Sequence, residues 1–154
     1  MFDTAEEEIG ILIYSGYFFL VDDPRTMGLI RSKAEAGVRV RILIGDPDSS
    51  VLRERGDDEG IDDGLASRVR NVIVLSRPLV DVENIEIRLH ETVLYNSIYR
   101  GDDELLVNTH VYGLGAAHAP VLHLRQVVGG GIVSTYLNSF DKVWASARPL
   151  TAAA

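Results

Sequence analysis

Short apolar segments and segments with helical periodicity alternate along the first part of the chain. Residues 9–14 and 38–44 are rich in Ile, Leu and Val, as strands buried inside a sheet usually are. Between them, Asp23 and Pro24 are typical of a helix start, and Gly37 is typical of a helix end. A strand, a helix and a second strand in this order predict two parallel strands joined by a right-handed crossover.

The rest of the chain predicts one long helix, four more strands and a closing helix. The helices are expected over residues 61–79 and 133–147, and the strands over residues 85–89, 93–99, 105–112 and 121–127. The turn at residues 100–103 is short enough to join its two neighbouring strands in a hairpin. Together these elements predict an α/β fold that forms a single domain over residues 1–150, followed by a frayed tail at residues 151–154.

Three aromatic residues mark one face of the closing helix. Tyr136, Phe140 and Trp144 are spaced four residues apart, so they lie on one stripe of the helix surface. Large aromatic side chains in such a stripe are expected to pack into the hydrophobic core. We therefore predict a structural role for these three residues.

The composition narrows the possible functions. The formal net charge is −8, and the only lysines are Lys33 and Lys142, with thirteen arginines scattered along the chain. Nucleic-acid-binding faces are usually basic, so direct DNA binding by this domain is not expected. No apolar run reaches the roughly 20 residues that span a bilayer. The first residues are acidic, unlike a secretory signal, so we expect a cytoplasmic protein without membrane association.

The sequence gives no reason to expect a metal or a cofactor. The chain has no cysteine, which excludes thiol catalysis, iron–sulfur clusters and cysteine-based zinc sites. The acidic residues 56–64 lack the alternating oxygen ligands and the final glutamate of a calcium-binding EF-hand loop. None of the four histidines is paired with another at the spacing of a helical metal site.

Three segments of the chain resemble one half of the phospholipase D superfamily. They are the passage Ala-Gly-Val-Arg-Val-Arg-Ile-Leu-Ile at residues 36–44, the hairpin, and the closing helix with its aromatic stripe. Together these segments span nearly the whole chain. The resemblance implies a phospholipase D-like mixed sheet that is flanked by helices.

The signature of that superfamily is His-x-Lys-x4-Asp, followed after a few residues by Gly-Ser-x-Asn. Alignment on the hairpin places Tyr95, Ser97 and Asp102 at the His, Lys and Asp positions, and Asn108 and Thr109 at the Gly-Ser pair. In active members the His is the nucleophile and the Lys neutralises the phosphate, so catalysis needs both groups. Because only the Asp remains, the resemblance implies a domain without the superfamily's phosphodiesterase chemistry. Single-motif members work as homodimers, which implies a homodimer here.

Polar side chains within the predicted hairpin strands point to a binding pocket. Tyr95 and Ser97 share one face of their strand, and Asn108, His110 and Tyr112 share one face of the next. Hydroxyl, amide and imidazole groups suit a small polar ligand with little or no charge. The alternative is that these groups face solvent or bind backbone atoms. The predicted ligand contacts are Tyr95, Ser97, Asn108, Thr109, His110, Tyr112 and His118.

Residues 95–100, 107–113 and 117–125 also resemble an uncharacterised domain that follows helix-turn-helix segments in bacterial transcriptional regulators. This resemblance implies a non-catalytic ligand-sensing or dimerisation domain, which contacts DNA only through an attached helix-turn-helix segment. Two alternatives remain open. The first is a diverged phosphodiesterase or nuclease that uses Tyr95 or His110 as its nucleophile, and the second is a purely structural protein–protein module.

Overall fold

The computed structural model describes residues 1–152, without the side chain of Phe18; residues 153 and 154 of the predicted tail lie outside the described residues. Within residues 1–152, seven strands form one mixed sheet in the order β6-β5-β4-β1-β2-β3-β7. The strands are β1 (Glu8–Ile13), β2 (Arg39–Gly45), β3 (Ile85–His90), β4 (Asn96–Gly101), β5 (Glu104–Thr109), β6 (Val121–Arg125) and β7 (Arg148–Pro149).

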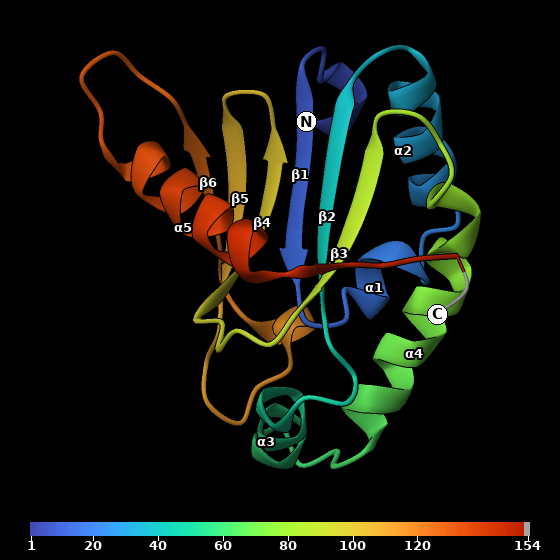
Figure 1. The fold of residues 1–154 in the computed structure, drawn as a ribbon. Helices are drawn as coiled ribbons and strands as arrows, with labels where there is room; N and C mark the ends of the chain where they lie inside the picture. Colours follow the sequence, from blue (N-terminus) through green and yellow to red (C-terminus); the bar gives the residue numbers. More distant parts are fainter. Residues whose placement is uncertain (153–154) are drawn as a thin grey trace.

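Helices cover both faces of this sheet. The α-helices are α1 (Tyr17–Leu20), α2 (Arg25–Glu35), α3 (Ser50–Asp58), α4 (Gly64–Ser76) and α5 (Ile132–Ser146), and the 3₁₀ turns are η1 (Phe2–Thr4), η2 (Arg77–Leu79) and η3 (Ala116–His118). In Figure 1, α2 and α4 lie on one side of the sheet and α5 lies on the other. The predicted α/β fold, a mixed sheet flanked by helices in a single domain, is confirmed.

The centre of the sheet follows the predicted strand–helix–strand unit. β1, β2 and β3 are parallel, and the buried side chains of Ile11, Ile42 and Ile87 lie side by side across them. β4 pairs with the other edge of β1 in the antiparallel direction. Because helices cover both faces, the side chains on both sides of β1 and β2 are buried, which explains the continuous apolar sequence of these strands. Gly37, just after α2, has a φ of 97°, which favours glycine at this helix end.

Three short elements differ from the sequence prediction. α1 lies between the first predicted strand and the helix start at Asp23 and Pro24, where no element is predicted. α3 precedes the predicted long helix, and β7 adds a strand at the edge beside β3. The predicted helix over residues 61–79 is divided into α4 and η2. Its start is delayed because Asp62 takes a left-handed conformation, with a φ of 46°, which cannot continue a helix. The side chain of Ser49 caps α3 by accepting a hydrogen bond from the Leu52 N–H at 3.2 Å.

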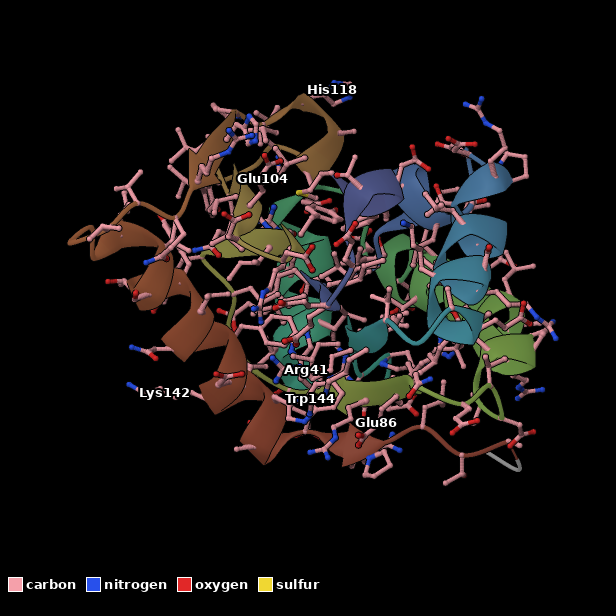
Figure 2. All side chains as sticks on the ribbon, turned by 90° about the horizontal axis from the view of Figure 1, so that it is seen from above. Arg41, Glu86, Glu104, His118, Lys142 and Trp144 are labelled. Atoms are coloured by element: carbon pink, nitrogen blue, oxygen red, sulfur yellow. The ribbon has the colours of Figure 1, made fainter. Side chains whose placement is uncertain are left out.

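An arginine network fixes α5 on the sheet. The Arg41 guanidinium from β2 pairs with Glu8 of β1 at 2.5 Å and with Asp141 of α5 at 2.8 Å. The same guanidinium lies 4.8 Å from the ring centre of Phe140 and 5.4 Å from that of Trp144. Figure 2 shows Arg41 beside Trp144 where α5 crosses the sheet, with Lys142 on the outer side of the helix.

The prediction that the aromatic stripe packs against the core is confirmed, and two of its three members are buried. Phe140 and Trp144 are buried, and their rings are stacked with centroids 6.3 Å apart. Tyr136, one turn earlier, is half-buried at the margin of the core. These contacts place the end of α5, rather than its beginning, against the centre of the sheet.

The hairpin turn is held by Asp102, the residue that the sequence alignment predicts at the motif's Asp position. Its carboxylate accepts hydrogen bonds from the backbone N–H groups of Glu6, Glu7 and Glu8, at 2.8 to 2.9 Å. Burial opposes ionisation of this carboxyl, but the three N–H donors and the Arg100 cation hold the pKa of Asp102 below its usual range. Asp102 therefore joins the turn to the start of β1, and it lies at the opposite end of β4 from Ser97.

The described residues give two further findings. Within residues 1–152, no helix is both long enough and apolar enough to cross a membrane. The same part of the chain contains no group of three or more His, Asp or Glu side chains that is arranged to hold a metal ion.

Candidate ligand-binding cavity

A cavity of about 340 Å³ opens where β1 ends and β4 begins. In Figure 1 this end of the sheet is the lower one, beside α1 and α3. Open α/β sheets commonly bind ligands outside the carboxyl ends of their parallel strands. The cavity is lined by Tyr14, Ser15, Gly16, Tyr17, Asp22, Arg55, Glu59, Leu65, Arg68, Ser97, Tyr99, His110, Gly115, Ala116, Ala117 and His118.

A serine and a histidine form a hydrogen-bonded pair in the cavity wall. The Ser97 Oγ lies 3.1 Å from His110 Nε2, and the other ring nitrogen, Nδ1, lies 3.1 Å from the carbonyl oxygen of Leu94. A carbonyl oxygen only accepts hydrogen bonds, so this contact assigns the ring proton to Nδ1. Nε2 then accepts a hydrogen bond from the Ser97 hydroxyl. Ser97 is 3% exposed, so the pair is held within the wall.

Tyr14, the residue after β1, packs against the histidine of this pair. Its ring is stacked on the His110 ring at a centroid distance of 5.6 Å. Its hydroxyl accepts a hydrogen bond from the Leu94 N–H at 2.8 Å, and burial raises the pKa of this phenol. The Leu94 peptide thus bonds Tyr14 through its N–H and His110 through its carbonyl oxygen. These bonds fix the positions of both rings.

His110 is uncharged at neutral pH. Burial lowers the pKa of His110 to about 4, the Arg55 cation adds to this effect, and the bond to Leu94 opposes it. Arg55 of α3 pairs with Glu59, the residue that follows the helix, with 2.7 Å between Nε and Oε1, and each side chain is 11% exposed. Arg55 also donates a hydrogen bond to the carbonyl oxygen of Leu114 at 3.1 Å. These bonds hold both side chains of the ion pair in the wall of the cavity.

The depressed pKa of His110 predicts that acid weakens the fold. An unfolded histidine titrates near pH 6.5, whereas folded His110 has a pKa of about 4. Between these values the unfolded chain binds the additional proton, so the stability due to this group is complete above pH 6.5 and is lost as the pH falls towards 4. Because the ring is partly exposed, we expect its share of the loss to be below about 1.4 kcal/mol per pH unit.

Urea unfolding of the wild type and His110→Gln at pH 7, 6 and 5 measures this effect. The variant should show a shallower loss of the free energy of unfolding between pH 6 and pH 5. Part of the slope should remain, because burial also lowers the pKa of His90. Equal slopes for the two proteins would contradict the assignment to His110.

The structure brings three of the predicted ligand contacts to this cavity. Ser97 and His110 lie in its wall, and the exposed His118 lies at its rim. Tyr95 and Tyr112 lie outside it, with 81% and 83% of their side chains exposed. Both hairpin strands are shorter than predicted, because β4 begins at residue 96 and β5 ends at residue 109. The two tyrosines therefore lie beyond the ends of the paired strands.

The remaining predicted contacts bind the backbone of a nearby loop. Thr109 Oγ1 donates a hydrogen bond to the carbonyl oxygen of Pro120 at 3.2 Å. The amide nitrogen of Asn108 donates to carbonyl oxygens of the same loop, and this residue lines a second cavity instead of the first. The alternative interpretation, that polar hairpin groups bind backbone atoms, thus applies to these two residues.

Sequence reasoning missed Tyr14, Arg55 and Glu59. The sequence pattern assigns Tyr14 to the end of the strand over residues 9–14. In the structure it follows the strand, which is the position where a site residue is expected. Arg55 and Glu59 have the i, i+4 spacing of a helical ion pair, but the helix that carries them was not predicted. Recognising Ser49 as a helix cap would have revealed both residues.

Comparisons with known proteins give one family and a shared fold. No curated protein sequence matches the chain. TrmBL2, an archaeal chromatin protein whose structure is reported to show a novel mode of DNA binding, has a TM-score of 0.58 and 13% identity, over 97% of this chain and 46% of that one. Nuc from Salmonella typhimurium, a phospholipase D family member, has a TM-score of 0.55 and 15% identity, over 97% of this chain and 85% of Nuc.

These two likenesses show the fold alone, because both sequences are less than 25% identical to this one. The chain spans about half the length of the TrmBL2 chain. A family model described as "Domain of unknown function (DUF5919)" matches residues 15–151, which is most of the chain. The match includes the whole hairpin and the closing helix. The protein therefore belongs to the DUF5919 family.

Proposed function

We propose that this domain is a non-catalytic sensor of a small polar ligand within a bacterial transcriptional regulator. The observation that carries the proposal is the Ser97–His110 pair in the wall of the first cavity. The resemblance places Ser97 where the superfamily has its lysine, and Ser97 supplies an uncharged hydroxyl there. The neighbouring imidazole is also uncharged at neutral pH, because its pKa is about 4. Neutral donors and acceptors in a preformed cavity favour binding over phosphoryl transfer.

The charges around the cavity favour a ligand with no net charge. Arg55 and Glu59 neutralise each other within the wall. At the rim, the exposed side chains of Asp22 and Arg68 add one charge of each sign. The Arg68 guanidinium lies 5.9 Å from the ring centre of Tyr17, which leaves its donors near the opening. We therefore expect a neutral or zwitterionic molecule rich in hydrogen-bonding groups.

Ligand binding would act on DNA through a homodimer. β6 is the outer strand of the sheet within the described residues, and it exposes Val121 and Leu122. The loop after β6 and the start of α5 expose three more apolar side chains, Val127, Val128 and Ile132. A second copy of the chain would cover this surface. The DNA contacts would belong to an attached helix-turn-helix segment, and the likeness to TrmBL2 is compatible with such a role.

Thermal-shift measurements with sugars, nucleosides and amino acids test the proposal. We expect at least one neutral or zwitterionic compound to raise the melting temperature. Ser97→Ala should raise the Kd of that compound about tenfold through the loss of one hydrogen bond. Tyr95→Phe is the matched control, because Tyr95 lies outside the cavity, and it should leave the Kd unchanged. A library without hits, or hits that bind equally well to Ser97→Ala, would reject the proposal.

The mass of the protein in solution tests the proposed homodimer. Sedimentation velocity should give the mass of a homodimer for the wild type and a monomer for Leu122→Asp, which buries a charge in the proposed interface. A wild-type protein that sediments as a monomer with and without ligand would remove dimerisation from the proposal.

The alternative function, a diverged phosphodiesterase or nuclease, has less support. Tyr95 is 81% exposed and lies outside the first cavity, so its hydroxyl is not held in the described pocket. Both ring nitrogens of His110 already form hydrogen bonds. A phosphodiester substrate that wild type cleaves, and that Tyr95→Phe or His110→Gln does not, would restore this alternative.

A further inference from the structure

The first cavity is lined by two carboxylates and two guanidinium groups, and only one pair of them is joined. Arg55 and Glu59 bind each other in the wall, with 2.7 Å between Nε and Oε1. Asp22 and Arg68 line the same cavity and are exposed at its rim. Within residues 1–152, neither of these two side chains forms an ion pair or a hydrogen bond. The mouth of the cavity therefore presents one unpaired charge of each sign.

The two unpaired charges meet at Tyr17, the first residue of α1. The Arg68 guanidinium, which belongs to α4, lies 5.9 Å from the centre of the Tyr17 ring. Asp22 follows the end of α1, and its backbone N–H donates a hydrogen bond to the carbonyl oxygen of Tyr17 at 3.4 Å. All three residues line the cavity, and α1 contacts α4. The carboxylate and the guanidinium thus extend from positions beside the same residue at one opening.

The inner wall of the cavity is polar but uncharged. Ser97 is 3% exposed, and its hydroxyl donates to His110, so its oxygen lone pairs remain to accept a hydrogen bond. His110 adds no charge at neutral pH, because burial lowers its pKa to about 4. A charged group is unfavourable against such a wall unless it finds a partner there. The wall therefore favours an uncharged ligand group that carries an N–H or O–H donor.

We infer that the first cavity binds a free α-amino acid whose side chain is uncharged and carries a hydrogen-bond donor. The ammonium group pairs with Asp22, the carboxylate pairs with Arg68, and the side chain extends to Ser97. An α-amino acid holds its two opposite charges on one carbon, which matches two opposite charges beside one residue of the rim. The inference rests on the proposed function, and it narrows the ligand to asparagine, glutamine, serine, threonine and their close analogues.

Removal of one ligand charge at a time tests the inference. The intact chain is titrated by calorimetry with asparagine, glutamine, serine and threonine, and the tightest binder is compared with two of its derivatives. The N-acetyl derivative lacks the ammonium group, and the α-amide lacks the carboxylate. We expect at least one of the four amino acids to bind, and each derivative to bind about tenfold more weakly than its parent.

Two variants assign the ligand charges to their partners. Asp22→Asn should raise the Kd of the amino acid about tenfold, and it should bind the parent and the N-acetyl derivative equally well. Arg68→Gln should likewise no longer distinguish the parent from the α-amide. A general effect on folding would not produce this match between each variant and one ligand group. Arg70→Gln is the control, because Arg70 is exposed on the same helix and lies outside the cavity, and it should leave every Kd unchanged.

The outcomes separate this inference from the proposed function. Equal binding of the parent and its derivatives would overturn the inference, as would a preference for the parent that neither Asp22→Asn nor Arg68→Gln alters. A sugar or nucleoside that binds through Ser97, when none of the four amino acids binds, would overturn the inference and leave the proposed function intact. If no compound binds at millimolar concentration, both are rejected.

Discussion

Arg41→Met should lower the free energy of unfolding by about 3–5 kcal/mol, which is the range for breaking a buried ion pair from one side. Methionine retains the apolar stem and part of the packing against Phe140, so the loss reflects the charge. Arg41 is 8% exposed, and its removal leaves the Glu8 carboxylate, itself mostly buried, with Arg100 as its remaining partner at 2.7 Å. The end of α5 also loses the pair with Asp141.

Urea unfolding followed by tryptophan fluorescence measures this effect, because Trp144 lies against the Arg41 guanidinium and is the only tryptophan. The matched control is Arg31→Met on α2, because Arg31 and its partner Glu35 are both exposed to solvent. Exposed helical pairs contribute less than about 1 kcal/mol. If Arg41→Met cost no more than Arg31→Met, the network would not hold α5 on the sheet. Adding Glu8→Gln to Arg41→Met should recover part of the loss, because it removes a mostly buried carboxylate that has lost one of its two cations.

Asp102→Ala should destabilise the domain by about 2–3 kcal/mol. The variant loses the carboxylate that accepts three backbone N–H groups, and hydrogen bonds to charged groups contribute about 1.5–3 kcal/mol each when buried. The estimate is below the sum of the three because Glu6 and Glu7 are exposed and water replaces part of their bonding. Alanine is also strained at a φ of 53°.

Two further variants separate these causes. Asp102→Gly loses the same hydrogen bonds but fits the left-handed backbone, so it should be more stable than Asp102→Ala by about 1 kcal/mol. Asp102→Asn tolerates the backbone and keeps one acceptor oxygen, so it should be the most stable of the three. Thermal unfolding at pH 7 gives the ranking. Asp102→Ala with wild-type stability would show that the turn does not depend on the carboxylate.

The stability provided by Asp102 should also depend on pH. Its pKa is lowered in the folded state, so the unfolded carboxyl takes up a proton first as the pH falls. The contribution is complete above the unfolded pKa, near 4, and is lost at lower pH. The difference in stability between wild type and Asp102→Asn should therefore narrow in acid.

Asp102, which the sequence alignment predicts to be the one retained motif residue, has a structural position. Asp102 stands at the opposite end of β4 from the cavity and bonds the start of β1. These bonds give Asp102 a structural role at the hairpin turn, so its presence is not evidence of catalysis. The function that we propose depends instead on Ser97, whose hydroxyl lies in the cavity wall and bonds His110.

The sequence by itself determined the order and type of most elements. Runs of Ile, Leu and Val identified β1 and β2, and Gly37 identified the end of α2, because burial and backbone conformation act on neighbouring residues. The aromatic spacing likewise identified the buried face of α5 through Phe140 and Trp144. The sequence pattern does not reveal α1 and β7, because four or fewer residues show no period. It does not reveal α3 because that helix is mostly polar.

Only the tertiary structure decided which side chains form the site. Strand alternation placed Tyr95 with Ser97, but β4 begins at Asn96, so Tyr95 lies beyond the ladder and faces solvent. The partners of His110 are Ser97, Leu94 and Tyr14, the last of which is nearly a hundred residues away. Such contacts depend on where strands end and how loops close over them. These are long-range outcomes of packing, which a local pattern of residues does not encode.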